Sequence, residues 1–441
     1  VRGRLQYDVG YVSNPDDNPN GGLNTRNLGF NTRARRIRLG AEGTIPGGIG
    51  YKCEMDFASG TVGFGDCLLS YTPTNSPFNV AIGNQETNNG LEQISSSRWS
   101  SFVERAAFDD AFVNTRRLGI NLGYVSKDNV FRLNAGLWAG HSIDSTLDDD
   151  SWIFGSRAVY APLMGGNQLH FGINYQHREF QSNNNQSASG SSGRASTNQV
   201  ARYRARPYSQ LTDVRFVDTG NFAAKSDDII GLEAAGIFKS LHIAAEGQYL
   251  KTHVGYDPGD IIPVGDLDQF VFNSPSGCSG SACIDPVYVL PDGNPSFWGG
   301  YIEAGYFLTG ETRGYKNGAW DRTKVLKPFS KGGFGAIQIN GRLDYLDLDT
   351  GKLHEATNNN FRTGAFSATN NYTRGGKQLG LQAGLTWIPE DYLRVLLNYS
   401  HAFVTGGPFA DEVTGVSTSD PDAADEDYGV DVVQARFQVD F

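Results

Sequence analysis

Val430-Asp-Val-Val-Gln-Ala-Arg-Phe-Gln-Val-Asp-Phe441 is the most informative stretch of this sequence. From Val433 onward, apolar residues occupy every second position and polar residues fill the positions between them. A period of two places one set of side chains on each face of a β-strand. Soluble antiparallel sheets also have one dry and one wet face, but they seldom end on an amphipathic strand whose last residue is aromatic. The stretch therefore predicts a strand with one polar face and one face in apolar surroundings.

Similar strands recur along the chain, and their number predicts a closed barrel. Most are about ten residues long or slightly longer, which suits tilted strands that cross a bilayer. An aromatic last residue is common in bacterial outer-membrane β-barrels, whose assembly signal the closing stretch resembles. We therefore predict an all-β fold, a transmembrane antiparallel β-barrel of about 16 strands, with residues 1–441 as a single domain. The strands lie near residues 2–13, 33–45, 49–59, 63–72, 78–86, 115–125, 130–141, 152–161, 167–180, 228–238, 241–252, 297–308, 333–346, 376–388, 392–404 and 428–441.

The connections between these strands alternate in length. Short turns at 46–48, 74–77, 126–129, 239–240 and 389–391 alternate with long polar loops at 14–30, 87–113, 181–226, 253–296, 347–375 and 405–427. Short turns on one rim and long extracellular loops on the other are typical of membrane barrels. The connection at 309–331 is an exception, because it is long and yet falls on the short-turn side. An even number of strands brings both termini to that same side.

The composition is compatible with a membrane barrel and excludes a helical membrane protein. Of the 441 residues only 39% are hydrophobic, and no stretch approaches the roughly 18 apolar residues of a membrane-spanning helix. A barrel needs no such stretch, because lumen-facing residues alternate with lipid-facing ones. The 55 glycines, 20 tyrosines and 26 phenylalanines favour turns and strands. Because the chain opens directly on a strand, we expect that any targeting segment has been removed.

The net charge of −11 argues at first sight against an anionic ligand. Many of the acidic residues, however, lie in predicted loops, at 148–150 and between 420 and 427. Acidic runs in loops are most simply explained by solubility. The net charge therefore says little about the interior of a barrel.

The four cysteines form two local pairs, which predict two disulfides in an oxidising compartment. Cys278 and Cys283 bracket a short polar stretch inside a predicted loop, which a disulfide closes readily. Cys53 and Cys67 are nearly equidistant from a turn near Gly60 and could face each other across a hairpin. Metal binding is the alternative, but no histidine or further cysteine lies close to either pair.

The predicted lumen face is rich in charged residues of both signs. One interpretation is that these charges pair across strands and stiffen the wall. As a set they also make a polar lumen, and sixteen strands are wide enough for a water-filled one. The arginines are Arg4, Arg36, Arg38, Arg117, Arg132, Arg157, Arg178, Arg342, Arg394 and Arg436, and the acids include Asp8, Glu42, Glu54, Asp56, Glu233, Glu246, Glu303 and Asp344.

Two arginine clusters indicate more than a polar lumen of a general kind. Arg33-Ala-Arg-Arg-Ile-Arg38 holds four arginines in six residues, and strict alternation cannot aim both Arg35 and Arg36 inward unless the strand bulges or ends there. In the loop 181–226, Arg202, Arg204 and Arg206 alternate, so an extended chain points them all one way at roughly 6–7 Å spacing. Such a row offers an anion successive weak sites, as selective conduction requires, and guanidinium matches phosphate oxygens. The alternatives for the loop arginines are a solvated basic loop or a patch that binds lipopolysaccharide.

The loop 87–113 differs from the other loops because it carries a mildly helical apolar pattern. Leu91, Ile94, Phe102 and Val103 follow this pattern. We expect the loop to fold into the barrel and to narrow it. In that position Ser95–Ser97 and Arg98 would present hydroxyls and a cation at the constriction. The alternative is a loop that caps the outside of the barrel or contacts a neighbouring subunit.

The chain resembles the phosphate-selective porin O/P family of Gram-negative outer membranes over essentially its whole length. Each matching stretch is weak alone, but their order and spacing are specific. The stretches are Gly3-Arg-Leu-Gln-Tyr-Asp8, Arg35-Arg-Ile-Arg-Leu-Gly40 followed by Gly50-Tyr-Lys52, Gly90-Leu-Glu92, Ser95-Ser-Ser-Arg98, Glu104-Arg105, Arg116-Arg-Leu-Gly119, Val217-Asp-Thr-Gly220, Tyr345-Leu-Asp-Leu-Asp349 and the closing strand.

The resemblance implies a homotrimer of sixteen-stranded barrels, with a third loop folded into each pore and passive uptake of anions. It also implies that Arg202, Arg204 and Arg206 form an arginine ladder, that Arg35 and Arg36 line the pore, and that Ser96 and Ser97 supply hydroxyls at the constriction. Selective members of the family carry a lysine there. This third loop has Gln93 near that place and no lysine, and Lys377 has outward parity. The permeant is thus phosphate, polyphosphate or another small anion.

The prediction is a non-enzymatic outer-membrane porin with an arginine-lined pore. It needs no cofactor and no metal, and it has outer-membrane lipid and lipopolysaccharide but no nucleic acid as neighbours. The alternative is a general or differently selective porin of the same barrel type. An enzyme is disfavoured, because no Gly-x-Ser-x-Gly motif appears and the seven histidines have no metal-binding spacing. A soluble β protein or adhesin is the third class, which would need no detergent for extraction.

Overall fold

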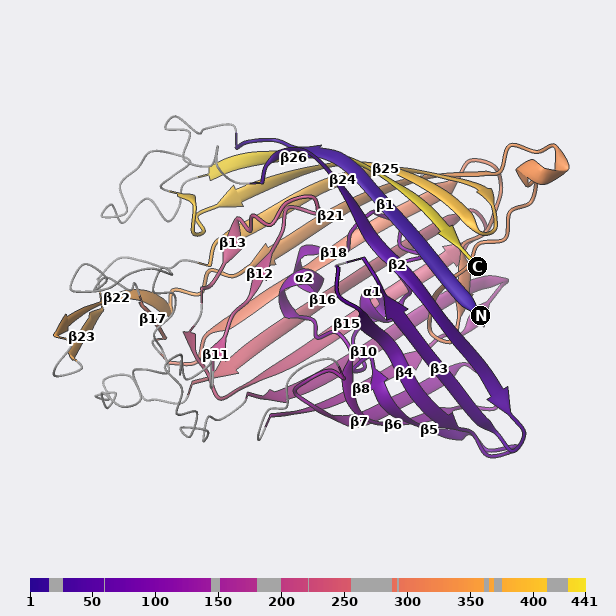
Figure 1. Ribbon diagram of the computed structural model, residues 1–441, viewed down its shortest axis with the longest axis horizontal. Coiled ribbons are helices and arrows are strands. Elements are labelled where there is room, and N and C mark those ends of the chain that lie inside the picture. The colour runs from indigo at the N-terminus through magenta and orange to yellow at the C-terminus, as the bar shows by residue number, and fades with distance from the viewer. Residues whose placement is uncertain are drawn as a thin grey trace.

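The computed structural model describes residues 1–15, 27–58, 60–143, 151–180, 200–220, 222–254, 288–291, 293–360, 365–368, 375–410 and 427–441. Sixteen antiparallel strands close into a barrel (Figure 1), which confirms the predicted fold class. The predicted ranges agree with the observed ones to within a few residues. The strands are β1 (Arg2–Val12), β2 (Gly29–Ile45), β3 (Ile49–Asp56), β4 (Gly63–Tyr71), β5 (Phe78–Gln85), β6 (Arg117–Val125), β7 (Phe131–Ala139), β8 (Trp152–Tyr160), β10 (Asn167–Glu179), β15 (Ser226–Phe238), β16 (Leu241–His253), β18 (Ser296–Phe307), β21 (Ala336–Asp347), β24 (Lys377–Glu390), β25 (Leu393–Thr405) and β26 (Asp427–Asp440).

The closing stretch is the last strand of the barrel, and it pairs with the first. In the register of β1 and β26, Tyr7 lies opposite Phe437 and Asp8 lies opposite Arg436. The backbones of Gly3 and Phe441 exchange two hydrogen bonds of 2.8 and 3.1 Å. A side chain at Gly3 would overlap the Phe441 ring, because the terminal aromatic residue packs directly on this glycine. The final residue thus secures the seam at which the barrel closes.

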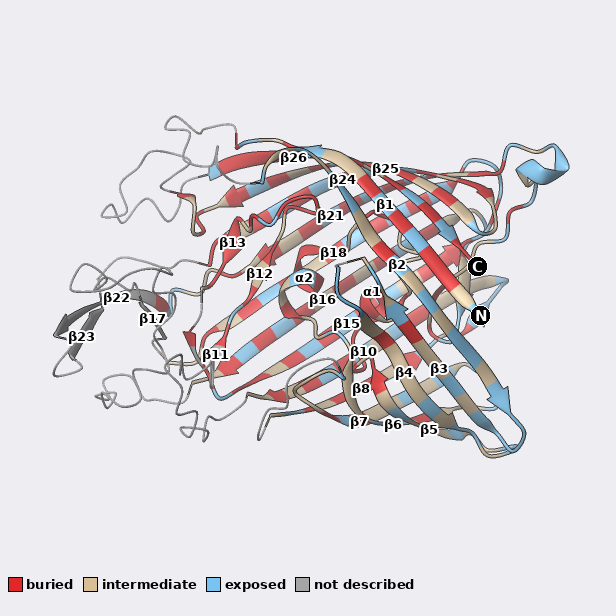
Figure 2. Ribbon diagram, in the orientation of Figure 1, coloured by how far each residue is buried: buried red, intermediate tan, exposed pale blue. Residues whose placement is uncertain are grey.

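The two faces of the sheet differ sharply in character (Figure 2). On β1 and β26 the outward side chains Leu5, Tyr7 and Phe437 are 48%, 43% and 50% exposed. The alternate residues Asp8 and Arg436 are each only 1% exposed. Exposed apolar residues outside and buried charges inside reverse the usual pattern of a soluble protein. A barrel with lipid around it and a polar lumen has this arrangement.

The short turns and both chain termini share one rim, which we call the turn-side rim (Figure 1). The opposite, loop-side rim carries the long connections, among which β11 (Val200–Ala201), β14 (Phe222–Ala223), β17 (Tyr288–Pro291), β22 (Leu353–Asn360) and β23 (Ala365–Ala368) form a small five-stranded sheet. The exceptional connection between β18 and β21 lies on the turn side. It contains β19 (Gly314–Lys316), β20 (Ala319–Asp321) and a short 3₁₀ helix, η2 (Phe329–Lys331). Within the described residues, no helix has the length and apolar character needed to cross a membrane.

Parts of three connections lie against the inner wall of the barrel. They are the third loop, with α1 (Leu91–Ile94) and α2 (Ala107–Phe112), the loop between β10 and β15, and the β19–β20 hairpin. In the second of these, the Tyr203 hydroxyl donates to Asp227 at 2.5 Å. Sequence reasoning treats 181–226 as an extracellular loop. Its described part packs inward from the loop-side rim, because its many apolar residues are buried against the wall.

A disulfide joins Cys53 of β3 to Cys67 of β4, which lie opposite each other in the strand register. Their neighbours Lys52 and Asp66 face the lumen, so the disulfide lies on the outward face. The other predicted pair, Cys278 and Cys283, lies outside the described residues.

Candidate functional site

The third loop is held inside the barrel by hydrogen bonds between its backbone and polar side chains of the wall. Three backbone N–H groups of the loop donate to wall residues on three different strands. The acceptors are Glu246 for Glu92 at 3.0 Å, Asn398 for Val103 at 2.8 Å and Asp344 for Ala107 at 2.9 Å. A loop that is fixed to several strands presents its side chains in a constant geometry to the lumen.

A buried ion-pair network reinforces this attachment. The Arg342 guanidinium lies 2.5 Å from Glu92 of the third loop and 2.6 Å from Glu303 of β18. All three side chains are less than 10% exposed. Removing one partner of such a buried pair leaves an uncompensated charge and is strongly destabilising. Arg342 therefore has a structural role in holding the loop, as the cross-strand interpretation of the inward arginines predicts.

Strand β2 bulges at Arg35, and the bulge turns an unusual number of arginines toward the lumen. In its register with β1, Gln6 lies opposite Arg36 and Tyr7 lies opposite Ala34, so Arg35 has no partner residue. Before the bulge the odd-numbered residues face inward, and after it the even-numbered ones do. All four arginines from Arg33 to Arg38 consequently lie on the lumen side. A bulge re-aims side chains in this way wherever one extra residue enters a strand.

Of these four arginines, Arg36 is the one that is both buried and without a carboxylate partner among the described residues. It is 7% exposed, and its guanidinium donates to the Gln6 side-chain oxygen at 2.9 Å. Among the described residues no carboxylate lies within ion-pair distance of it. By contrast, Arg35 pairs with Glu104 at 2.9 Å and Arg38 pairs with Asp56 at 2.7 Å. The charge of a buried arginine without a directly paired carboxylate is compensated only in part, here by the more distant Glu104.

Two connected chambers lie between the third loop and strands β1 to β4. The turn-side chamber has a volume of about 440 Å³ and the loop-side chamber about 270 Å³. Five residues line both chambers and therefore mark the passage between them. They are Arg36, Arg38, Gln93, Arg105 and Arg116. Four of the five are arginines, so any solute that moves between the chambers passes a ring of guanidinium groups.

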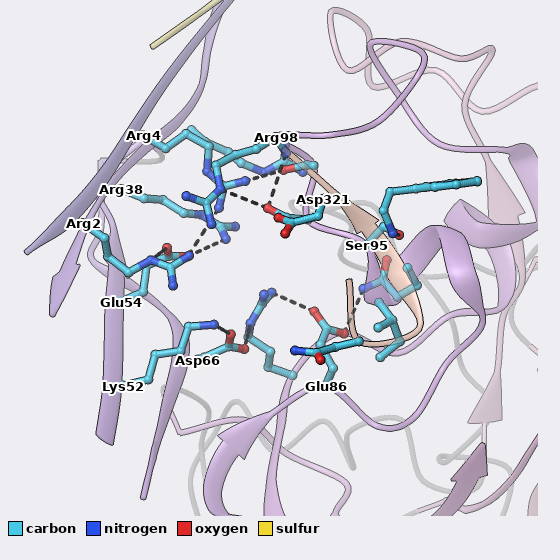
Figure 3. Close-up of a pocket in the computed structure, with 18 of the residues that line it drawn as sticks. Arg2, Arg4, Arg38, Lys52, Glu54, Asp66, Glu86, Ser95, Arg98 and Asp321 are labelled. Carbon is cyan, nitrogen blue, oxygen red and sulfur yellow. Dashed lines mark hydrogen bonds and ion pairs between the residues drawn. The ribbon is translucent and has the colours of Figure 1, made fainter. Parts of the chain in front are cut away.

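Both chambers carry more basic than acidic side chains, although the whole chain is acidic. In the turn-side chamber Arg2, Arg4, Arg36, Arg38, Lys52, Arg98, Arg105, Arg116 and Lys316 outnumber Glu54, Asp66, Glu86 and Asp321. Figure 3 shows Arg4, Arg38 and Arg98 gathered on one side of this chamber, with Asp66 and Glu86 on another. In the loop-side chamber Arg35, Arg36, Arg38, Arg105, Arg116 and Arg206 outnumber Glu104, Asp109 and Asp110. The local charge of the lumen is thus opposite in sign to the net charge of the chain.

Glu104 illustrates the strength of this positive field. Burial alone would raise the pKa of the Glu104 carboxyl, but the neighbouring charges of Arg35, Arg436 and Arg36 hold it well below its usual range. The carboxylate is therefore ionised at every physiological pH. An anion that entered the same region would be stabilised by the same guanidinium groups.

Ser96, Ser97 and Arg98 line the turn-side chamber, as expected from the sequence if the third loop folds inward. Arg4 donates to the Ser97 hydroxyl oxygen at 2.6 Å, and Arg98 donates to that of Ser96 at 3.3 Å. Both contacts use the serine oxygen as an acceptor, so each hydroxyl hydrogen can still be donated to a solute. The Arg98 guanidinium lies 3.8 Å from Asp440 and above the Trp99 ring.

The three loop arginines differ in position. Their alternate neighbours Tyr203 and Ala205 are buried, so Arg202, Arg204 and Arg206 share the opposite face of the segment. Only Arg206 lines a chamber. Arg202 pairs with Asp218 at 2.8 Å, whereas Arg204 has no carboxylate partner among the described residues. The three residues lie on one face, but of the three only Arg206 lines the loop-side chamber.

Basic residues are concentrated in this loop beyond the three arginines. Burial, together with the charges of Arg206 and Arg204, lowers the pKa of Arg215 to about 10. Arg215 therefore adds to a cluster of like charges near the loop-side chamber. Such a cluster raises the local concentration of anions at the entrance of a channel.

Several residues that line the chambers were not identified as site residues from the sequence. Arg105 donates to the carbonyl oxygens of Glu92, Gln93 and Ser95 and so closes the third loop on itself. Arg116 pairs with Asp66 at 2.5 Å and with Glu86 at 3.0 Å. Both belong to stretches that carry the family resemblance, and this resemblance is the feature of the sequence that could have identified them as site residues. Lys316 comes from the β19–β20 hairpin, and only the anomalous length of that connection pointed to it.

An apolar outer surface, a polar lumen and an inward-folded third loop on a sixteen-stranded barrel define an outer-membrane porin. The chain belongs to the phosphate-selective porin O and P family, whose model matches residues 1–261 and 292–441. It is accordingly an integral β-barrel protein of the outer membrane.

Three comparisons give the range of similarity. The chain is 32% identical to an uncharacterized protein of Caulobacter vibrioides, over 100% of this chain and 73% of that protein. It is 35% identical to Porin O of Pseudomonas aeruginosa over 26% of this chain and 27% of that protein. The fold is similar to that of Pseudomonas putida OprB, with a TM-score of 0.51 and 10% identity over 100% of this chain and 93% of the other.

Proposed function

We propose that the pore gives passive diffusion to small anions and that it favours phosphate or polyphosphate. The observation that carries this proposal is Arg36. It is buried, it has no carboxylate partner among the described residues, and it lines both chambers at the passage between them. A passing anion supplies the missing counter-charge, and phosphate oxygens match the guanidinium geometry with two parallel hydrogen bonds.

The arrangement around Arg36 suits conduction better than tight binding. Arg35, Arg38 and Arg116 each have a carboxylate partner, so each attracts an anion only in part. Selective flow requires several sites, each favourable enough to enter and weak enough to leave. The serine hydroxyls of the third loop add neutral donors in the turn-side chamber. A phosphate ion would exchange its hydration shell for these groups step by step.

The alternative is a general or differently selective porin, and the lumen acids favour it. Glu54, Asp66 and Glu86 line the turn-side chamber together with the basic residues. Gln93 also occupies the passage where selective members of the family carry a lysine. These features weaken the field that an anion meets after it has passed Arg36.

Planar-bilayer recordings test the proposal directly. Reversal potentials in a potassium chloride gradient give the sign of the selectivity, and phosphate added to the chloride bath tests for block. We expect chloride to permeate in preference to potassium and phosphate to reduce the chloride current. A cation preference without block by phosphate would contradict the proposal and leave the general porin. Anion preference without phosphate block would support the anion channel but not its phosphate preference.

We further propose that the protein assembles as a homotrimer, with lipopolysaccharide around its loop-side rim. The family resemblance supports the trimer, and the outer-membrane location supports the contact with lipopolysaccharide. Native mass spectrometry of the detergent-extracted protein measures the assembly state. A monomer in several mild detergents would contradict the trimer, and lipopolysaccharide absent from the extracted complex would contradict the lipid contact.

A further inference from the structure

The connection between β18 and β21 has two parts, one inside the barrel and one outside it. Its first part, the β19–β20 hairpin, enters the barrel, where the Trp320 backbone N–H donates to the Ser95 hydroxyl at 3.0 Å. The second part, Lys324–Phe334, projects beyond the turn-side rim around η2 (Figure 1) and is largely exposed (Figure 2). We call this second part the foot. It takes no part in the pore, and the porin function gives no reason for it.

The foot has a defined structure. Gly332 has a φ of 77°, which allows the chain to turn back after η2, and Gly333 and Gly335 donate backbone hydrogen bonds to Pro328 and Lys327 at 3.0 and 2.9 Å. Below it, Val325 packs in a small core with Phe307, Ala336 and Ile388. The foot therefore presents the same side chains to its surroundings at all times.

Its apolar side chains are exposed and continue the outer surface of the barrel. Leu326, Phe329 and Phe334 are 60%, 60% and 62% exposed. Phe334 stacks on Trp387 with ring centroids 5.6 Å apart, and Trp387 donates its indole N–H to the Phe334 carbonyl at 2.7 Å. Trp387 shares the outward face of β24 with Leu381 and other residues that face lipid. Aromatic residues in this position at the end of a barrel strand are typical of the membrane interface.

The foot is also basic. Lys324, Lys327 and Lys331 are exposed, and none has an ion-pair partner among the described residues. The nearby acids are occupied by backbone groups of the foot. Glu390 accepts from Ser330 at 2.5 Å, Asp391 from Val325 at 2.8 Å and Glu311 from Leu326 at 3.2 Å. These carboxylates form no ion pair with the three lysines, whose exposed side chains can therefore reach an external anion.

We propose that the foot binds the anionic phospholipid headgroups of the leaflet that meets the turn-side rim. Exposed aromatic and aliphatic side chains with lysines beside them are the composition of segments that lie in a bilayer interface. The continuity with the outer face of β24 places the foot beside that interface, and the unpaired lysines complement phosphate headgroups. Each lysine near an anionic membrane surface contributes about 1 kcal/mol. The foot therefore anchors the barrel at a fixed depth.

A nitroxide label at position 330 tests where the foot lies. Ser330→Cys is labelled in a chain that also carries Cys278→Ala and Cys283→Ala, so that the label has a single site. The protein is placed in nanodiscs of phosphatidylcholine, alone or in an equimolar mixture with phosphatidylglycerol. We expect collisions of the label with oxygen to exceed those with a water-soluble nickel chelate, and phosphatidylglycerol to lower the nickel collisions further. A label that is freely accessible to nickel in both mixtures would overturn the proposal.

Charge variants then test the role of the lysines. In the labelled protein, Lys324→Glu, Lys327→Glu and Lys331→Glu are compared with Lys225→Glu, Lys251→Glu and Lys352→Glu, an equal change at the exposed lysines of the loop-side rim. The label is titrated with short-chain phosphatidylglycerol. We expect the affinity at the foot to fall roughly fivefold for each foot lysine replaced, and the loop-side variant to leave it unchanged. Equal effects of the two variants would overturn the proposal, and unchanged channel conductance confirms that both variants are folded.

Discussion

Arg36 and Arg436 invite comparison because they flank the same strand on the same face of the barrel. Both lie next to β1, Arg36 opposite Gln6 and Arg436 opposite Asp8. Both are buried, at 7% and 1% exposure. Arg436 pairs with Asp8 at 2.7 Å and with Glu104 at 2.6 Å, whereas Arg36 has only the neutral oxygen of Gln6.

The difference shows that burial alone does not reveal the role of an inward arginine. Two carboxylates neutralise Arg436, which ties the closing strand to β1 and to the third loop. Arg36 has no such partner and lies where both chambers meet. The charge balance around each guanidinium therefore separates an arginine that supports the wall from one that serves a permeating anion. The following predictions test this distinction.

The largest effect is expected from Arg436→Met. The substitution leaves Asp8 buried without a counter-charge, whereas Glu104 keeps its pair with Arg35. Breaking a buried pair in this way costs about 3–5 kcal/mol. Urea titration of folding into phospholipid vesicles measures the loss. The matched control is the double variant Asp8→Asn, Arg436→Met, which leaves no carboxylate unpaired because Glu104 keeps Arg35, and which should regain most of the lost stability. A single variant as stable as the parent would mean that Arg436 does not hold the seam.

Arg36→Gln is expected to act on permeation and not on stability. Hydrogen bonds to charged groups contribute about 1.5–3 kcal/mol, so phosphate affinity, measured as block of the chloride current, should fall roughly tenfold to a hundredfold. Folding stability should not fall, because no carboxylate is left unpaired. Arg33→Gln is the matched control, since Arg33 faces the lumen on the same strand but is exposed and lines neither chamber, and it donates to the Gln210 carbonyl at 2.9 Å. Equal losses in both variants would remove the special role of Arg36.

The wall of the barrel could be predicted from the sequence almost completely. Period-two alternation depends only on neighbouring residues and on the contrast between lipid and lumen, so the strands, their faces and the pairing of β26 with β1 all follow from it. The need for a bulge at Arg35 could be predicted in the same way, because two adjacent arginines conflict with strict alternation.

The interior could be predicted only in part, because the partners there come from distant parts of the chain. The alternation along their strands places both Arg36 and Arg436 on the inward face. The residues next to them in the sequence do not indicate that Asp8 and Glu104 both pair with Arg436. The inward position of Tyr203 and its loop likewise depends on contacts with wall residues such as Asp227. Neither the alternation of Arg202, Arg204 and Arg206 nor their spacing indicates that Arg206 alone lines a chamber.

Gln93→Lys should strengthen anion binding at the passage only modestly. Gln93 donates to Glu86 at 3.0 Å, so a lysine there would be partly neutralised by that carboxylate. A lysine that pairs with Glu86 adds little net charge to the passage, so we expect less than about a tenfold gain in phosphate block, which corresponds to about 1.4 kcal/mol. Gln93→Met, which adds no charge, should give no gain. A gain far above tenfold would show that Glu86 does not neutralise a lysine at this position. The rule that a carboxylate partner removes the effect of a basic residue on the anion would then not hold for lysine.

The smallest effect is expected at the loop arginines. There the same difference, between an arginine with a carboxylate partner and one without, occurs at the loop-side entrance of the pore. Arg204 has no carboxylate partner among the described residues and Arg202 pairs with Asp218, yet neither lines a chamber. Arg204→Gln should lower the anion conductance by roughly twofold at low salt, and the loss should vanish at high salt because a distant charge is screened within about 10 Å at 0.1 M. Arg202→Gln should change the conductance less, because Asp218 already compensates its charge. A loss at Arg204 that persists at high salt would mean that this guanidinium touches the permeating anion, and the arginine ladder would then extend beyond Arg206.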